Sequence, residues 1–78
     1  MEAQTPQESG QLEGRYTNYF EVGHNAFEFV LDFGQLFSES EKVLHTRIVT
    51  SPAYAKALLE LLEESIGRYE QTFGAIQR

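Results

Sequence analysis

The stretch Ala26-Phe-Glu-Phe-Val-Leu-Asp-Phe-Gly34 decides the fold of this chain. Glu28, Val30 and Asp32 alternate with four large apolar residues, namely Phe27, Phe29, Leu31 and Phe33. Alternation with a period of two is typical of a β-strand with one apolar face. We therefore expect a strand over residues 26–34 whose Phe-rich face is covered by the rest of the chain.

Two further stretches rich in β-branched and aromatic residues, 15–23 and 42–50, flank the first. Both compositions are typical of strands. The turn cluster at residues 23–25 predicts an antiparallel hairpin between the first two strands, and the polar segment 35–42 predicts a second connection. The alternative is that the middle strand continues past Gly34 with a bulge there, because the apolar spacing carries on beyond it.

A long helix is predicted to start at Ser51-Pro52 and to stop at Gly74. Serine is a preferred N-cap, proline suits the first helical position, and glycine suits the C-terminal stop. Apolar residues at helical spacing form a core-facing stripe, namely Ala55, Leu58, Leu62, Ile66, Tyr69 and Phe73. The sequence thus predicts an α+β fold: a small antiparallel three-stranded sheet packed on one long C-terminal helix, in the order β-β-β-α.

The 78 residues suit a single domain, and they include no Cys. Residues 1–14 are rich in Gln, Glu, Gly and Ser, so we expect a disordered N-terminal tail there and one domain over residues 15–78. A domain this small leaves much of its surface in water, and no disulfide or thiolate metal site is there to stabilise it. An aromatic core or association with another chain must supply the stability.

The charge of the chain argues against several partners. Twelve acidic and six basic side chains give a formal charge of −6, and the basic residues do not cluster. Duplex nucleic acid and anionic membranes both attract clustered Lys and Arg. The sequence has no apolar run near the roughly 20 residues that span a bilayer and no secretory signal pattern. We expect a cytoplasmic protein with neither nucleic acid nor membrane as partner.

One helix covers only one face of a sheet, so the other face and the flank of the helix are left exposed. The candidate interface residues are Tyr19, Val30, Ile48, Leu59 and Leu61. Exposed apolar patches usually mark an interface. We expect a homodimer or higher oligomer, formed through the open sheet face or by edge pairing of strands. The alternative is a monomer whose surface hydrophobic residues are merely scattered.

The sequence carries no pattern typical of a catalytic, metal or cofactor site. His24 and His45 show no ligand spacing. Glu28 and Asp32 lie roughly 13 Å apart along a strand, too far for a carboxylate pair acting on one bond. Cross-strand pairing of one of them with Arg47 is the better explanation. We expect no enzyme activity, no cofactor and no metal.

Four segments together resemble a family of short prokaryotic proteins known as a domain of unknown function (number 3467). They are Asn18-Tyr-Phe-Glu-Val22, Glu28-Phe-Val-Leu-Asp-Phe-Gly-Gln35, Arg47-Ile-Val-Thr-Ser-Pro-Ala-Tyr-Ala-Lys-Ala-Leu-Leu59 and Tyr69-Glu-Gln-Thr-Phe-Gly74. The resemblance implies a compact single domain and no site residues. The order of elements and the acidity also resemble the subunit of the SecB export chaperone, which assembles through its sheets and binds extended apolar segments.

Three functions follow as hypotheses. The first is a non-enzymatic homodimeric interaction module that docks a protein partner on its sheet face or helix flank. The second is a chaperone or adaptor that binds extended polypeptide at a sheet edge. The third is an enzyme or ligand-binding site formed only between subunits, from polar groups such as Asn18, His45 and Arg47.

Overall fold

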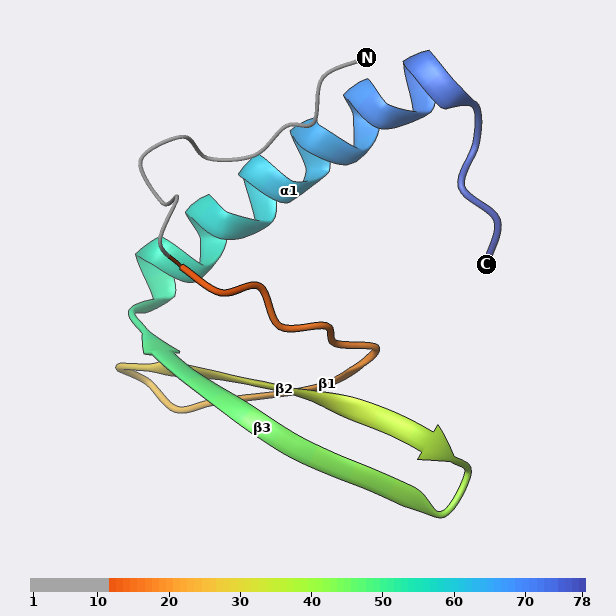
Figure 1. Ribbon diagram of the computed structural model, residues 1–78. Coiled ribbons are helices and arrows are strands. Elements are labelled where there is room, and N and C mark those ends of the chain that lie inside the picture. Colours follow the sequence, from red (N-terminus) through yellow and green to blue (C-terminus); the bar gives the residue numbers. More distant parts are fainter. Residues whose placement is uncertain (1–11) are drawn as a thin grey trace.

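The structure is a computed structural model, and it describes residues 12–78. Its elements are β1 (Tyr19–His24), β2 (Phe29–Ser38), β3 (Glu41–Thr50) and α1 (Pro52–Phe73). The strands form one antiparallel sheet in the order β1-β2-β3, and the helix follows them (Figure 1). The predicted β-β-β-α order is confirmed. Most of the predicted tail lies outside the described residues, and its last part, residues 12–14, is exposed and has no regular structure.

The turn between β1 and β2 lies later in the sequence than expected. The Oδ1 of Asn25 accepts hydrogen bonds from the backbone N–H groups of Phe27 and Glu28, at 2.8 and 2.9 Å. An Asn side chain that bonds the backbone in this way fixes a turn. The prediction that the middle strand starts at Ala26 is therefore wrong: the strand starts at Phe29, and Phe27 lies in the turn with 82% of its surface exposed.

The bulge considered at Gly34 is present. β2 continues to residue 38, and its register with β3 shifts between Phe33 and Gly34. A Cβ atom added at Gly34 would collide with the carbonyl oxygen of Val43 and would lie 2.9 Å from the Cα of Leu44. Only glycine leaves room for this close approach of two strands.

The strand register sorts the side chains of the sheet into two faces, because residues directly opposite each other share a face. We call one the Phe face; it carries Phe20, Val22, His24, Phe29, Leu31, Phe33, Thr46, Ile48 and Thr50. We call the other the Asp face; it carries Tyr19, Glu21, Gly23, Val30, Asp32, Gly34, Arg47 and Val49. On the Phe face, the rings of Phe20 and Phe33 meet edge to face with their centroids 5.7 Å apart.

The helix begins and ends where the sequence predicts. The Oγ of Ser51 accepts a hydrogen bond from the backbone N–H of Tyr54 at 3.2 Å, and Pro52 is the first helical residue. At the other end, the N–H of Gly74 donates to the carbonyl of Glu70 at 2.9 Å, and Gly74 has a positive φ of 95°. Within residues 12–78, no helix is long and apolar enough to cross a membrane.

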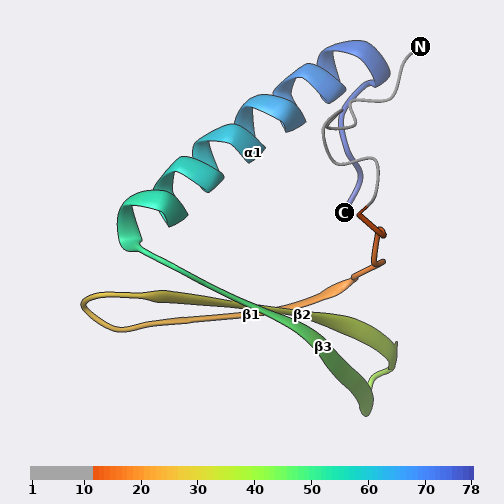
Figure 2. The ribbon, with the colours of Figure 1, turned by 60° about the vertical axis from the view of Figure 1, so that its left-hand side comes forward.

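The helix does not cover the sheet of its own chain. None of residues 52–73 is buried, and Ala55 in the first turns is the only one that is half-buried. Figure 2 shows the helix and the sheet diverging from their junction at Ser51. Since Ser51 alone separates β3 from α1, the connection is shorter than the two to six residues usual between a strand and a helix. The expected packing of the helix on the Phe-rich face is therefore absent within one chain.

Candidate functional site

The Phe face is an uncovered apolar surface. In the central row, Val22 and Ile48 flank Leu31, and Phe20 stands beside Phe33 in the next row. The two outer strands leave their apolar side chains exposed, at 57% for Phe20 and 47% for Ile48, and Leu31 is only half-buried. No apolar side chain anywhere in residues 12–78 is buried. In soluble proteins, exposed apolar surfaces of this kind usually belong to interaction sites.

The helix carries a second uncovered apolar surface, which we call the helix stripe. It consists of Ala55, Leu58, Leu62, Ile66, Tyr69 and Phe73. At 100° per residue these positions fall within an arc of roughly 80° on one side of the helix. Leu62, near its middle, is 54% exposed, and the rings of Tyr69 and Phe73 contact each other at 4.9 Å between centroids. The stripe is formed as predicted. Ile76 of the C-terminal segment lies beside Ile66 and Tyr69, and no stripe residue is buried within residues 12–78.

The total surface area is large for the mass of the chain. The chain exposes 7177 Å². A compact monomer of this mass exposes roughly 4,800 Å². If residues 1–11 are discounted at the full value for an unfolded chain, an excess of roughly 1,000 Å² still remains. A stable protein interface buries roughly 800 Å² or more on each partner. The excess is therefore as large as one complete interface.

The five candidate interface residues do not lie on one surface. Ile48 lies on the Phe face, opposite Leu31. Leu59 lies beside the helix stripe, roughly 60° from Leu62, whereas Leu61 lies roughly 100° away on the flank. The register with β2 places Val49 on the face of Val30, and Ile48 on the other.

Tyr19 and Val30 lie on the Asp face. The hydroxyl of Tyr19 donates to a carboxylate oxygen of Glu21 at 2.6 Å and accepts from the Nζ of Lys42 at 2.9 Å. The same ammonium lies 4.9 Å from the centre of the tyrosine ring, and its hydrogen bond to the hydroxyl raises the pKa of Lys42. Val30 is half-buried between Gly23 and Val49. Tyr19 is thus part of a polar cluster, and Val30 belongs to the same face.

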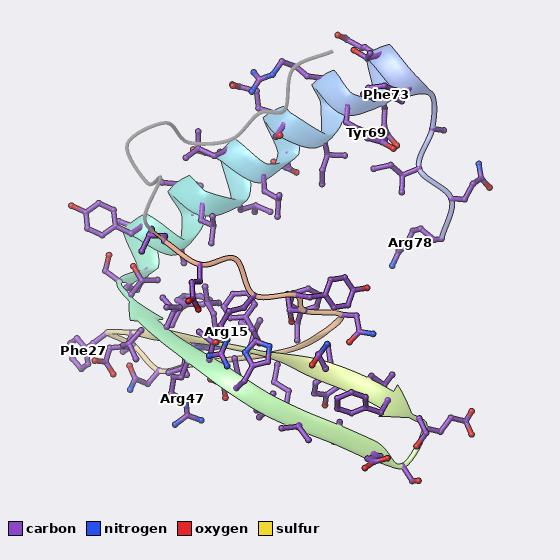
Figure 3. The ribbon with its side chains drawn as sticks, in the orientation of Figure 1. Arg15, Phe27, Arg47, Tyr69, Phe73 and Arg78 are labelled. Atoms are coloured by element: carbon purple, nitrogen blue, oxygen red, sulfur yellow. The ribbon has the colours of Figure 1, made fainter. Side chains whose placement is uncertain are left out.

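The centre of the Asp face is an ion pair. Asp32 accepts two hydrogen bonds from Arg47, from Nε and from one terminal nitrogen, both at 2.8 Å. Asp32 is the one charged residue of the described part of the chain that is buried, with 7% of its surface exposed. Its hydrogen bond to the guanidinium lowers the pKa of the Asp32 carboxyl. The predicted cross-strand pair is confirmed for Asp32, and Arg47 lies on the side of the sheet away from the helix (Figure 3).

The polar residues considered for a site between subunits each have hydrogen-bond partners within the chain, and His45 and Arg47 line one shallow hollow with Asp32. Asn18 exchanges hydrogen bonds with the backbone of Leu36, at 2.8 and 3.4 Å. The Nδ1 of His45 bonds the hydroxyl of Thr46 at 2.7 Å, and Arg47 is paired with Asp32 on the Asp face. Among residues 12–78 there is no group of three acidic, His or Cys side chains able to hold a metal. Within one chain these side chains therefore form hydrogen bonds to the backbone or to other side chains of the sheet.

The segment before β1 contributes contacts that sequence reasoning missed. The hydroxyl of Thr17 donates to the carbonyl of Gly34 at 2.7 Å and accepts from its N–H at 3.0 Å, as a neighbouring strand would. Arg15 donates to the His45 carbonyl at 3.3 Å and the Thr46 hydroxyl at 3.4 Å. Figure 3 shows Arg15 on the side of the sheet that faces the helix. A positive charge therefore lies at the edge of the Phe face.

The comparisons with known proteins give a family. The chain matches the sequence model of the family described as "Protein of unknown function (DUF3467)" over residues 2–78. No curated protein and no solved structure shows a significant match. Because the matched region spans nearly the whole sequence, the chain belongs to the DUF3467 family.

Proposed function

We propose that this protein is a non-enzymatic interaction module that works as a homodimer and docks a protein partner. The observation that carries the proposal is that the Phe face and the helix stripe are both uncovered, while no apolar side chain in residues 12–78 is buried. Ordering a chain costs conformational entropy that burial of apolar surface must offset. A second chain that buries these surfaces supplies the missing stabilisation.

A second copy is the simplest such chain. Each copy carries both an apolar sheet face and an apolar helix stripe. Two copies related by a twofold axis can therefore form two equivalent apolar contacts. The surplus surface of roughly 1,000 Å² or more per chain agrees with the area that each partner buries in a stable dimer. Association through these surfaces also explains the absence of a core within one chain.

The Asp face remains available to a different protein once the Phe face is covered. It combines polar groups with apolar patches at Val30 and Val49, as the non-obligate interfaces of soluble proteins do. Tyr19, with its ring exposed in part and its hydroxyl in a hydrogen-bond network, is a residue type enriched in such interfaces. We therefore place the partner on the Asp face and self-association on the Phe face and helix.

A second candidate function is binding of extended polypeptide at a sheet edge. The strand order β1-β2-β3 supports it, because the outer edge of the 10-residue strand β3 pairs with no strand in the described chain. An unpaired edge is a template for strand addition. Val30→Asp separates the two candidates: it weakens a partner that docks on the Asp face and leaves strand addition at the edge intact.

Sedimentation velocity on the purified protein tests the self-association. We expect a species of twice the 8.9 kDa of one chain at high micromolar concentration. Circular dichroism on the same sample reports whether the helix is formed. A folded species with the mass of one chain at that concentration would contradict the proposal.

A further inference from the structure

We propose that the dimer closes by exchange of helices: α1 of each copy lies with its stripe on the Phe face of the other copy. The inference rests on the proposed homodimer and deepens it by assigning the occupant of each apolar surface. Two other arrangements would also bury apolar area, namely a helix against a helix and a Phe face against a Phe face. Three observations favour the exchange.

The first observation is the direction of the helix. It leaves the sheet on the side of the Phe face, and only Ala55 near the junction is partly covered by its own chain. Ser51 is both the single connecting residue and the N-cap, and the proline after it has a fixed backbone angle. A junction this short holds the helix away from its own sheet, so the helix does not occupy the space over the Phe face, where Arg15 lies at the edge.

The second observation is the match in length. The Phe face runs along β2 from Phe29 to Phe33, a distance of roughly 13 Å. The stripe from Leu58 to Ile66 spans roughly 12 Å along the helix axis. The aliphatic centre of the stripe is therefore about as long as the Phe face, and Tyr69 and Phe73 extend beyond it toward the end of the helix.

The third observation is the distribution of charge. Helix residues 52–73 include four Glu, one Lys and one Arg, so the helix is net negative. The paired strands hold three acidic residues: Glu21 and Asp32 lie on the Asp face, and Glu41 lies at the far end of β3. Arg15 stands at the edge of the Phe face. In the exchange, an acidic helix meets the rows of the Phe face around Leu31, which hold no acidic residue. Two such helices side by side would bring like charges together.

Cross-linking of single-cysteine variants tests the exchange, because the chain has no natural Cys. Ile48→Cys labels the Phe face and Leu62→Cys labels the stripe, and both positions are exposed in the single chain. The two variants are mixed unfolded, refolded together and treated with a short bifunctional thiol reagent. We expect a dominant cross-linked product that joins position 48 of one chain to position 62 of the other, identified by mass spectrometry of the linked peptides.

Glu60→Cys is the matched control, because Glu60 lies roughly 160° from Leu62 around the helix. It should give at least tenfold less product with Ile48→Cys than Leu62→Cys does. Ile66→Cys, on the same stripe, replaces Leu62→Cys if the latter fails to refold by circular dichroism.

Three results would overturn the exchange while leaving the homodimer in place: efficient cross-linking of Leu62→Cys with itself, efficient cross-linking of Ile48→Cys with itself, or a dimer that forms neither these products nor the mixed one. A monomeric mass in sedimentation is a different failure, since it removes the proposed homodimer itself.

Discussion

The centre of the sheet and the helix are stabilised in opposite ways. Asp32 and Gly34 are the buried residues of the described chain, and each is held by its own chain, through Arg47 and Thr17 respectively. The helix has its caps and one ion pair along its surface, but none of its residues is buried within the described part of the chain. A helix of this kind draws most of its stability from packing of its apolar face. The sheet centre is therefore held within one chain, whereas the apolar stripe of the helix stays exposed there.

The largest expected effect is at the sheet centre. Gly34→Val places side-chain atoms against the Val43 carbonyl and the Leu44 Cα, and both are backbone atoms that cannot move aside without breaking the pairing of β2 with β3. We expect loss of cooperative unfolding, seen by circular dichroism and thermal melting. Gly23→Val is the control, since nothing lies within 4 Å of a Cβ at that strand position. Equal stability of the two variants would show that the bulge is not tightly packed.

The next largest effect is on the helix. Leu62→Asp should raise the dissociation constant of the dimer at least roughly 100-fold, because a buried Leu contributes about 1.5–3 kcal/mol and a carboxylate in its place must be desolvated. Sedimentation over a dilution series measures it. Glu60→Asp, on the opposite side of the helix, should leave the constant unchanged. An unaffected dimer in Leu62→Asp would show that the stripe is not part of the interface.

The third effect is a pH dependence at the sheet centre. The pKa of Asp32 is lower in the folded chain than its ordinary value of 3.8, because Arg47 stabilises the ionised form. Its contribution to stability is therefore complete above the ordinary pKa and is lost as the pH falls through the lowered one. Asp32→Asn should be less stable than the natural protein at pH 7, and the difference should shrink below pH about 4. A pH-independent difference would exclude this role.

The smallest effect is at the junction of sheet and helix. Ser51→Ala removes the oxygen that accepts from the N–H of Tyr54 and should lower the free energy of unfolding by about 1 kcal/mol. Ser51→Asp keeps an acceptor there and should restore it. Denaturant titration measures both variants. Failure of Ser51→Asp to recover stability would show that the cap is not what the serine contributes.

Local signals in the sequence were enough to predict the order of the elements and the two ends of the helix. Ser51-Pro52 and Gly74 act through the backbone next to them, and the structure has both caps. Pairing of Arg47 with either Glu28 or Asp32 was also predicted, and the structure selects Asp32. The bulge at Gly34 was the alternative considered for the middle strand, and it is present.

Two features of the molecule could not be predicted from the sequence pattern: the turn before β2 and the position of the helix relative to the sheet. The turn at Asn25 depends on a side chain bonding the backbone, which shifted the strand start to Phe29. The helix stripe and the Phe face have matching apolar patterns, and so the sequence predicted that the helix packs on the sheet of its own chain. Periodicity does not tell whether the two matching surfaces meet within one chain or between two, since that depends on the length and geometry of the junction at Ser51.

The melting temperature as a function of protein concentration tests most directly whether the fold is completed by a second copy. Unfolding of a dimer into separate chains makes the midpoint depend on concentration. A 100-fold increase, from about 1 to 100 µM, should raise the midpoint by roughly 5–10 °C. A sharp transition with the same midpoint at both concentrations would contradict the dimer and show that one chain folds by itself.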